Sequence, residues 1–110
     1  MHLVGRIYLD TDEGVLLAEQ RVNLLEAIDR HGSIQKAARE MKLSYKSAWD
    51  AVNSMNNLCD QPLVQREVGG RRGGGSQLTE HGRNMIRLFR AVESEYQRAL
   101  DKVGGNLADI

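Results

Sequence analysis

The sequence predicts a mainly α-helical fold with a small amount of β-structure, built as a single domain over residues 1–110. Apolar residues recur at helical spacing between residues 19 and 57 and again between 79 and 103. Two shorter segments instead combine β-forming residues with turn residues. A chain of 110 residues, 41% hydrophobic and 27% charged, is long enough for one hydrophobic core but not for two.

Residues 1–18 predict an N-terminal β-hairpin. The stretch LVGRIYL (3–9) is rich in β-forming residues and places Leu3, Ile7 and Leu9 on one side of a period-two pattern. DTDEG follows as a cluster of turn residues, and VLL (15–17) is the expected returning strand. The chain is therefore expected to begin with two paired strands.

Residues 19–57 predict three helices. The first has an apolar face made of Val22, Leu24, Leu25, Ala27 and Ile28, and it ends at Gly32. Ser33 is a suitable N-cap for a second helix over 34–41, and Ser44 for a third helix over 44–57. The inward face of this third helix is expected to consist of Ala48, Ala51, Val52 and Met55. Because only three or four residues separate the second and third helices, the two must cross steeply, as in a helix-turn-helix.

Residues 62–78 predict two strands, 62–68 and 76–78, around the glycine-rich stretch GGRRGGG. A nucleotide-binding phosphate loop requires G-x-x-x-x-G-K-[ST], but Gly75 stands where the lysine should be. A flexible turn without a partner is a second interpretation. The third is the wing of a winged helix-turn-helix, because a helix-turn-helix comes directly before the hairpin. We favour the wing, with Arg71 and Arg72 at its tip and Arg66 on the strand that leads into it.

Residues 79–103 predict a long C-terminal helix with Thr79 as its N-cap. Its apolar positions follow a heptad-like pattern, which consists of Met85, Phe89, Val92, Tyr96, Ala99 and Val103. This apolar face is longer than a small domain can cover by itself. It predicts a dimerisation helix that packs against a second copy of the chain, so a homodimer is expected.

Composition argues against several classes of protein. Cys59 is the sole cysteine, and the sequence contains no CxxC or Cys/His spacing typical of a metal site. No acid/base pair, nucleophile arrangement or cofactor motif is recognisable, so neither an enzyme nor a cofactor-binding protein is expected. No apolar run approaches the length needed to span a bilayer, and no signal sequence is recognisable. A cytoplasmic protein is therefore expected.

The formal net charge of zero hides an uneven distribution. Residues 33–87 carry nine basic and five acidic side chains, a net charge of +4. Residues 1–32 have a net charge of −3, and residues 88–110 a net charge of −1. This polarity is expected if one face of the molecule meets phosphate groups.

The predicted DNA-binding residues lie on the second and third helices and on the wing. They are Ser33, Lys36, Ser44, Tyr45, Lys46, Ser47, Trp49, Asp50, Asn53, Arg66, Arg71 and Arg72. Asn53 can pair with adenine, and Lys46 can contact guanine or a phosphate. Asp50 can accept from a cytosine amino group, or it can instead orient Lys46 one helical turn earlier. Trp49 has two interpretations, half-buried packing and base contact, and packing is favoured.

The sequence also resembles a known family. The stretches GSIQKAAREMKLSYKSAWDAVNSMN (32–56) and LVQREVGGRRGGGSQLTEHG (63–82) closely resemble the N-terminal DNA-binding domain of the molybdate-responsive ModE transcription regulators. More distantly they resemble LysR-type regulators, which share the GS…AA opening and the LT..G before the final helix. The resemblance covers most of the chain and implies a winged helix-turn-helix, a homodimer joined through the long helices, and a palindromic double-stranded DNA operator.

By position, the resemblance places Ser44, Tyr45, Lys46, Ser47 and Asn53 on the recognition helix, and Arg71 and Arg72 on the wing. ModE regulators continue into molybdate-binding domains, and no oxyanion-binding segment is recognisable in these 110 residues. DNA binding without the molybdate-sensing domain is therefore expected. Two alternatives remain open: a winged-helix adaptor that binds another protein, and a small oxyanion-binding protein that uses the helix N-termini at Ser33 and Ser44.

Overall fold

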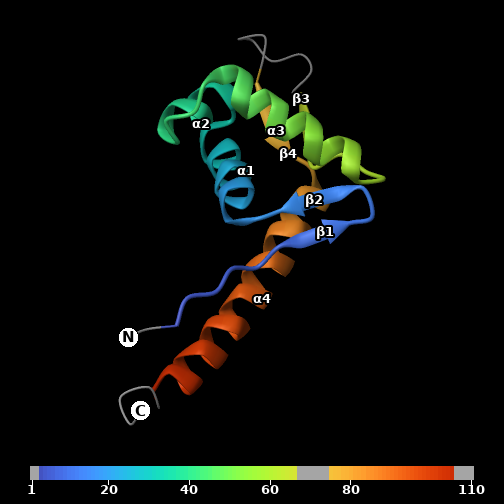
Figure 1. The fold of residues 1–110 in the computed structure, drawn as a ribbon. Coiled ribbons are helices and arrows are strands. Elements are labelled where there is room, and N and C mark those ends of the chain that lie inside the picture. Colours follow the sequence, from blue (N-terminus) through green and yellow to red (C-terminus); the bar gives the residue numbers. More distant parts are fainter. Residues whose placement is uncertain (1–2, 67–74, 106–110) are drawn as a thin grey trace.

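The computed structural model describes residues 3–66 and 75–105, which form two short β-hairpins and four helices (Figure 1). Their order is β1 (Leu9–Thr11), β2 (Gly14–Leu17), α1 (Glu19–His31), α2 (Ile34–Glu40), α3 (Tyr45–Leu58), β3 (Val64–Arg66), β4 (Ser76–Leu78) and α4 (Glu80–Gly104). A helix-turn-helix followed by a two-stranded hairpin is the winged helix-turn-helix order. The predicted fold class, mainly α with a small β content, is therefore confirmed.

The N-terminal hairpin is shorter than predicted. β1 pairs antiparallel with β2 over residues 9–11 only, whereas the predicted first strand covered residues 3–9; Asp10 and Thr11, predicted as turn, are part of the strand. The physical reason is that β2 has only four residues, so it offers no pairing partner to residues 3–8. These residues instead run beside α4, where Gly5 lies against the ring of Tyr96, and Leu3 remains exposed.

The wing strand β3 begins later than predicted, at Val64 rather than at residue 62. Pro62 has no backbone N–H to donate, and the side chain of Asn56 binds the backbone that follows it. Asn56 Oδ1 accepts from the N–H of Leu63 at 2.8 Å, and its Nδ2 donates to the carbonyl of Val64 at 3.0 Å. Asn56 therefore attaches the start of β3 to α3. Residues 67 and 68, also predicted as strand, lie outside the described residues.

The helices begin where the sequence predicted, because each predicted cap forms. Ser33, Ser44 and Thr79 accept hydrogen bonds from the N–H groups of Lys36, Ser47 and Gly82, respectively. Gly32 ends α1 in the left-handed conformation, with φ 66°. The second helix ends one residue earlier than predicted, at Glu40, with Met41 as its C-cap.

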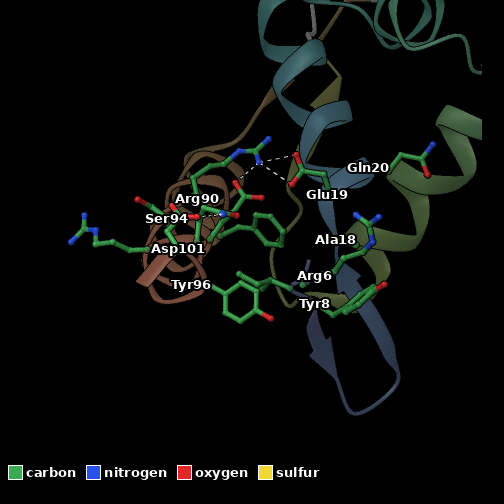
Figure 2. Close-up of a pocket in the computed structure, with 15 residues that line it drawn as sticks. Arg6, Tyr8, Ala18, Glu19, Gln20, Arg90, Ser94, Tyr96 and Asp101 are labelled. Atoms are coloured by element: carbon green, nitrogen blue, oxygen red, sulfur yellow. Dashed lines mark hydrogen bonds and ion pairs between the residues drawn. The ribbon is translucent and has the colours of Figure 1, made fainter. Parts of the chain in front are cut away.

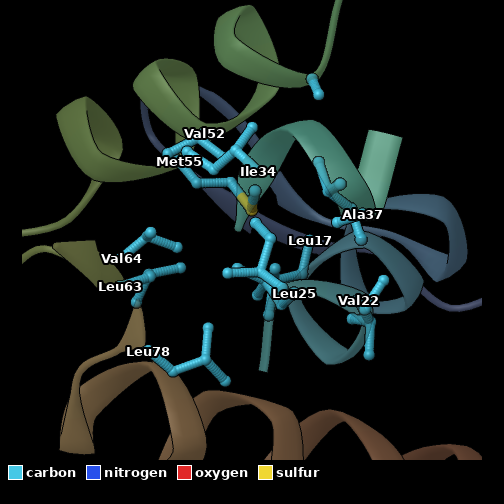
Figure 3. Packing of buried hydrophobic residues seen from close by; sticks show 14 of the residues in the cluster. Leu17, Val22, Leu25, Ile34, Ala37, Val52, Met55, Leu63, Val64 and Leu78 are labelled. Atoms are coloured by element: carbon cyan, nitrogen blue, oxygen red, sulfur yellow. The ribbon is translucent and has the colours of Figure 1, made fainter. Parts of the chain in front are cut away.

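One hydrophobic core joins the helix-turn-helix to both hairpins (Figure 3). Leu17 of β2, Leu25 of α1, Ile34 of α2 and Met55 of α3 meet at its centre, and Leu78 of β4 closes it beside α4. Fully burying a side chain of this size contributes about 1.5–3 kcal/mol. This shared core holds α2, α3 and the wing strands in one orientation.

α4 extends away from this core, so the molecule is elongated, with principal extents of 60 × 29 × 21 Å (Figure 1). Its first turns pack on α1 and β4, and its later turns run beside the N-terminal segment. In the part of the chain that the structure describes, no helix combines the length and the apolar character needed to cross a bilayer.

Candidate nucleic-acid interface

The start of α3 is fixed by a small hydrogen-bond ring. Ser44 Oγ accepts from the Ser47 N–H at 3.0 Å and donates to Ser47 Oγ at 2.8 Å. This ring satisfies one of the N–H groups that an α-helix leaves without a partner at its first turn. Both serines are exposed, as are Tyr45 and Lys46 beside them. The first turn of α3 therefore presents a capped, mainly polar surface to solvent.

Burial divides α3 into two faces. Ala48, Val52 and Met55 are buried against the core, and Ala51, predicted with them, is half-buried. The exposed face consists of Ser44, Tyr45, Lys46, Ser47, Asp50 and Asn53, all of which the sequence predicted to point outward. Side chains three and four residues apart lie together on a helix, so these residues form one continuous strip.

Trp49 connects α3 to the wing. Its ring is half-buried and packs against the core, in agreement with the favoured interpretation of packing. Tyr45 meets it edge-on, with the ring centroids 6.2 Å apart and the planes at 87°. Arg66 of β3 lies over its ring, with Cζ 5.1 Å from the centroid. A cation at this distance is attracted to the negative face of the indole, so Trp49 positions Arg66 beside α3.

Lys46 and Asp50 form an ion pair on the exposed strip. Lys46 Nζ lies 2.8 Å from Asp50 Oδ2, and both side chains are exposed. The hydrogen bond to Asp50 raises the pKa of Lys46 above its usual value. An exposed pair contributes little to folding stability. The pair instead positions the Lys46 ammonium, because Asp50 holds it on the outward face of α3. This agrees with one of the two interpretations of Asp50, that it orients Lys46.

The basic residues differ in whether a carboxylate neutralises them. Ion pairs engage Arg30 with Glu40, Arg83 with Asp29, Arg90 with Glu19, Glu26 and Glu93, and Arg98 with Glu95. No carboxylate pairs, among residues 3–66 and 75–105, with Lys36 and Arg39 of α2, Lys42 of the following turn, or Arg66 of β3. These four exposed cations lie on or next to the helix-turn-helix and the wing. Four further cations lack a carboxylate partner among these residues: Arg6, Arg21, Arg87 and Lys102. Arg21 donates instead to the carbonyls of Val15 and Leu16 and to Ser54 Oγ, and Arg87 donates to Asn84.

Sequence reasoning missed Arg39 and Lys42. Both are visible as basic residues beside the break between α2 and α3. The sequence alone does not show that Glu40 is already engaged, by Arg30 at 2.6 Å and His31 at 3.4 Å. These contacts lower the pKa of Glu40, with the Arg30 hydrogen bond as the main cause. The Glu40 carboxylate, which is next to Arg39 and Lys42 in the sequence, is therefore paired with residues of α1 instead.

Of the remaining predicted contact residues, two lie at the start of α2 and two lie outside the described residues. Ser33 caps α2 and Lys36 is exposed on its first turn. Arg71 and Arg72, predicted at the tip of the wing, lie outside the described residues. The wing strands that lead to them are paired, with Val64 opposite Leu78 and Arg66 opposite Ser76.

The predicted apolar face of α4 divides into two parts. Phe89 is buried and Met85 packs against the core, so both face the interior of their own chain. The later positions Val92, Tyr96, Ala99 and Val103 are exposed. Leu88, which the sequence pattern did not single out, is half exposed beside them.

A groove of about 780 Å³ lies between the N-terminal segment, the start of α1 and α4 (Figure 2). On one side Arg90 reaches Glu19 of α1, and on the other Tyr8 and Tyr96 line the groove. The groove is remote in sequence from the α3 strip, and its half-buried cation, Arg90, is already neutralised by three carboxylates.

The described residues show no metal-binding arrangement. No group of three or more His, Cys, Asp or Glu side chains in residues 3–66 and 75–105 is placed to hold a metal ion. Burial, together with Asp60, raises the pKa of the Cys59 thiol, which disfavours the reactive thiolate. The exposed strip of α3 is therefore the best candidate for a functional surface.

Comparison with known proteins agrees with this geometry. The family model of bacterial regulatory helix-turn-helix proteins, lysR family, matches residues 20–83. The molybdenum transport protein ModE of Azotobacter vinelandii is 52% identical over 97% of this chain, which covers 40% of that protein. The DNA-binding transcriptional dual regulator ModE of Escherichia coli K12 is 44% identical over 74% of this chain and 31% of its own length. The chain thus spans well under half the length of these relatives.

Solved structures share the fold at low sequence identity. The CbnR DNA-binding domain, solved in complex with DNA, superposes with a TM-score of 0.59 at 17% identity, over 76% of this chain and 91% of that one. Full-length LTTR LysG from Corynebacterium glutamicum gives a TM-score of 0.60 at 20% identity, over 83% of this chain and 30% of that one. With the family model matching more than half of its residues, the chain belongs to the LysR family of bacterial regulatory helix-turn-helix proteins.

Proposed function

We propose that this chain binds double-stranded DNA as a homodimer and acts in bacterial transcriptional regulation, in the cytoplasm. The observation that carries the proposal is the exposed strip of α3 bordered by cations that no described carboxylate neutralises. A helix of this kind fits the major groove, where side chains near its N-terminus reach base edges. The names of the relatives support the proposal, since one is a DNA-binding transcriptional regulator and one solved neighbour is bound to DNA.

In this proposal the residues divide into two roles. Lys46 and Asn53 contact base edges from the exposed strip, because both project from the outward face of α3. Lys36, Arg66, Arg71 and Arg72 contact phosphates, which raises affinity for every sequence without distinguishing between them. Arg66 is already placed beside α3 by its contact with Trp49.

The test is fluorescence anisotropy with a labelled duplex of random sequence over a salt series. For wild type, the logarithm of the binding constant should fall linearly with the logarithm of salt concentration, by about 0.9 per phosphate contact. Arg66→Gln should reduce that slope by about 0.9 per protomer, and Arg71→Ala with Arg72→Ala should reduce it further. Arg98→Gln is the matched control, because Arg98 pairs with Glu95 far along α4.

Base contact is tested separately, with an operator selected from a random duplex pool. Lys46→Ala should weaken operator binding about 10-fold or more, with a smaller effect on random duplex. Absence of any salt-sensitive binding by the wild-type chain contradicts the proposal and favours the protein-binding adaptor.

A further inference from the structure

Lys42 adopts a backbone conformation that side chains other than glycine rarely take. Its φ is 58°, and it is the sole non-glycine residue with positive φ in the described part of the chain. The surrounding hydrogen bonds hold it there: the Lys42 N–H donates to the carbonyl of Arg39 at 3.2 Å, and the Leu43 N–H to that of Ala38 at 2.9 Å. This pair of bonds is the Schellman motif, in which the left-handed residue follows the helix C-cap.

Glycine is the residue that normally occupies this position, because a Cβ crowds the backbone in the left-handed conformation. The same chain follows that rule at the end of α1, where Gly32 takes φ 66° and its N–H donates to the carbonyl of Ile28 at 2.8 Å. Two consecutive helices thus end in a left-handed residue, one with glycine and one with lysine. The lysine makes the turn between α2 and α3 less stable than glycine would.

The Lys42 side chain is exposed and lies two residues before the Ser44 cap of α3. Among the described residues no carboxylate pairs with it, and Glu40, two positions earlier, is bound to Arg30 and His31 on α1. A lysine carries a compact point charge on a flexible four-carbon stem, which suits a phosphate oxygen at the edge of a groove. The ammonium is therefore available next to the first turn of α3.

We propose that Lys42 is a phosphate contact of the DNA-binding surface and that the strained turn position is tolerated for this charge. Backbone strain that the surrounding structure enforces is often found at functional sites. Here the strained residue, Lys42, carries a positive charge that no described carboxylate neutralises. The proposal rests on the proposed function, because the phosphate belongs to the DNA that α3 binds. It assigns a contact to the turn itself, between Lys36 of α2 and Lys46 of α3.

The proposal predicts opposite effects on stability and on binding. Lys42→Gly relieves the strain and should raise Tm by about 3–6 °C, after allowance for the greater freedom of glycine in the unfolded chain. The same variant should weaken binding to a random-sequence duplex and reduce the salt slope by about 0.9 per protomer. Lys42→Gln keeps the strain and loses the charge, so it should weaken binding without raising Tm. Lys42→Arg should bind as wild type does.

Thermal unfolding by circular dichroism and anisotropy over a salt series provide the two measurements. Lys102→Gln is the control, because Lys102 is an exposed lysine at the far end of α4. If the wild-type chain binds duplex DNA and Lys42→Gly and Lys42→Gln keep its affinity and salt slope, the proposal for Lys42 is wrong and the proposed function stands. If the wild-type chain shows no salt-sensitive binding, the proposed function fails and this contact fails with it.

Discussion

Asp50 is an acidic side chain on a surface that we expect to meet phosphates. In the free protein its carboxylate faces the Lys46 ammonium at 2.8 Å, which cancels one positive charge of the exposed strip. Binding to arbitrary DNA therefore has to overcome both this ion pair and the repulsion between Asp50 and phosphate. A cytosine amino group in the major groove could replace the ammonium as hydrogen-bond donor. Asp50 would then favour particular sequences by penalising the others.

Asp50→Asn tests this role of Asp50. The variant frees Lys46 and removes one negative charge, so it should bind random-sequence duplex about 3- to 5-fold more tightly at moderate salt. The ratio of operator to random affinity should fall, because less repulsion opposes the wrong sequences. Asp101→Asn removes the same charge from the distal part of α4 and should leave both affinities unchanged. Unchanged or weaker binding of Asp50→Asn to random-sequence duplex would contradict the proposal that Asp50 opposes binding to the wrong sequences.

At the residue scale, the sequence predicted contacts that are local along the chain. The caps at Ser33, Ser44 and Thr79 and the pair between Lys46 and Asp50 all form, because each depends on neighbours three or four positions away. The contact between Arg66 and Trp49 was not predicted. It joins a strand to a helix, and only the packed fold brings the two together.

At the scale of elements, α4 is docked by the LT..G stretch at residues 78–82. The Thr79 N–H donates to the carbonyl of Leu63 at 2.9 Å, and the Thr79 hydroxyl donates to that of Pro62 at 2.7 Å. Gly82, one turn later, is buried, and a Cβ at this position would clash with the Leu63 carbonyl oxygen. The helix can therefore approach the start of β3 only because position 82 carries no side chain.

Gly82→Ala should destabilise the fold by about 1–3 kcal/mol, because the added methyl meets backbone that has to move. Gly104→Ala on the same helix is the control: among the residues that the structure describes, its Cβ would meet only the Leu3 side chain at 3.9 Å, an ordinary contact. Alanine favours helix over glycine, so this control should be neutral or slightly stabilising. Urea unfolding of the two variants measures the difference, and equal free energies of unfolding would contradict this account of α4 docking.

The element boundaries show where sequence patterns stop being informative. Helical periodicity and capping residues predicted all four described helices closely, because a helix satisfies its own backbone hydrogen bonds. The strand prediction at 62–68 was too long at its N-terminal end, and the prediction at 3–9 shares only Leu9 with β1, which continues through residues 10 and 11 that were predicted as turn. A strand exists only where a partner pairs with it. The short returning strand at 15–17 was predicted, but its register against residues 9–11 and the bond from Asn56 are not visible in a local pattern.

At the scale of the whole molecule, the direction of α4 is set by Arg90. Its guanidinium donates to Glu26 at 2.7 Å and to Asn23 at 2.8 Å on α1, and to Glu93 at 2.7 Å on α4 itself. The long-range contacts to Glu26 and Asn23 hold the helix against α1, and no sequence pattern predicted them. Beyond Arg90 the helix projects from the core with Val92 and Val103 exposed (Figure 1). An exposed apolar face on a projecting helix is typical of an oligomer contact.

Val92→Glu tests whether this face joins two copies of the chain. Val92 is 46% exposed, so the variant should fold normally, but a charge at the contact should shift the chain from twice 12.3 kDa to the monomer mass of 12.3 kDa. Because two linked recognition helices bind a palindromic operator far better than one, operator affinity should fall about 100-fold or more. Light scattering and anisotropy measure the two effects, with Ser94→Glu as the control on another side of the helix. A wild-type chain that is monomeric at micromolar concentration, or a Val92→Glu variant that stays dimeric, would exclude dimerisation through this face.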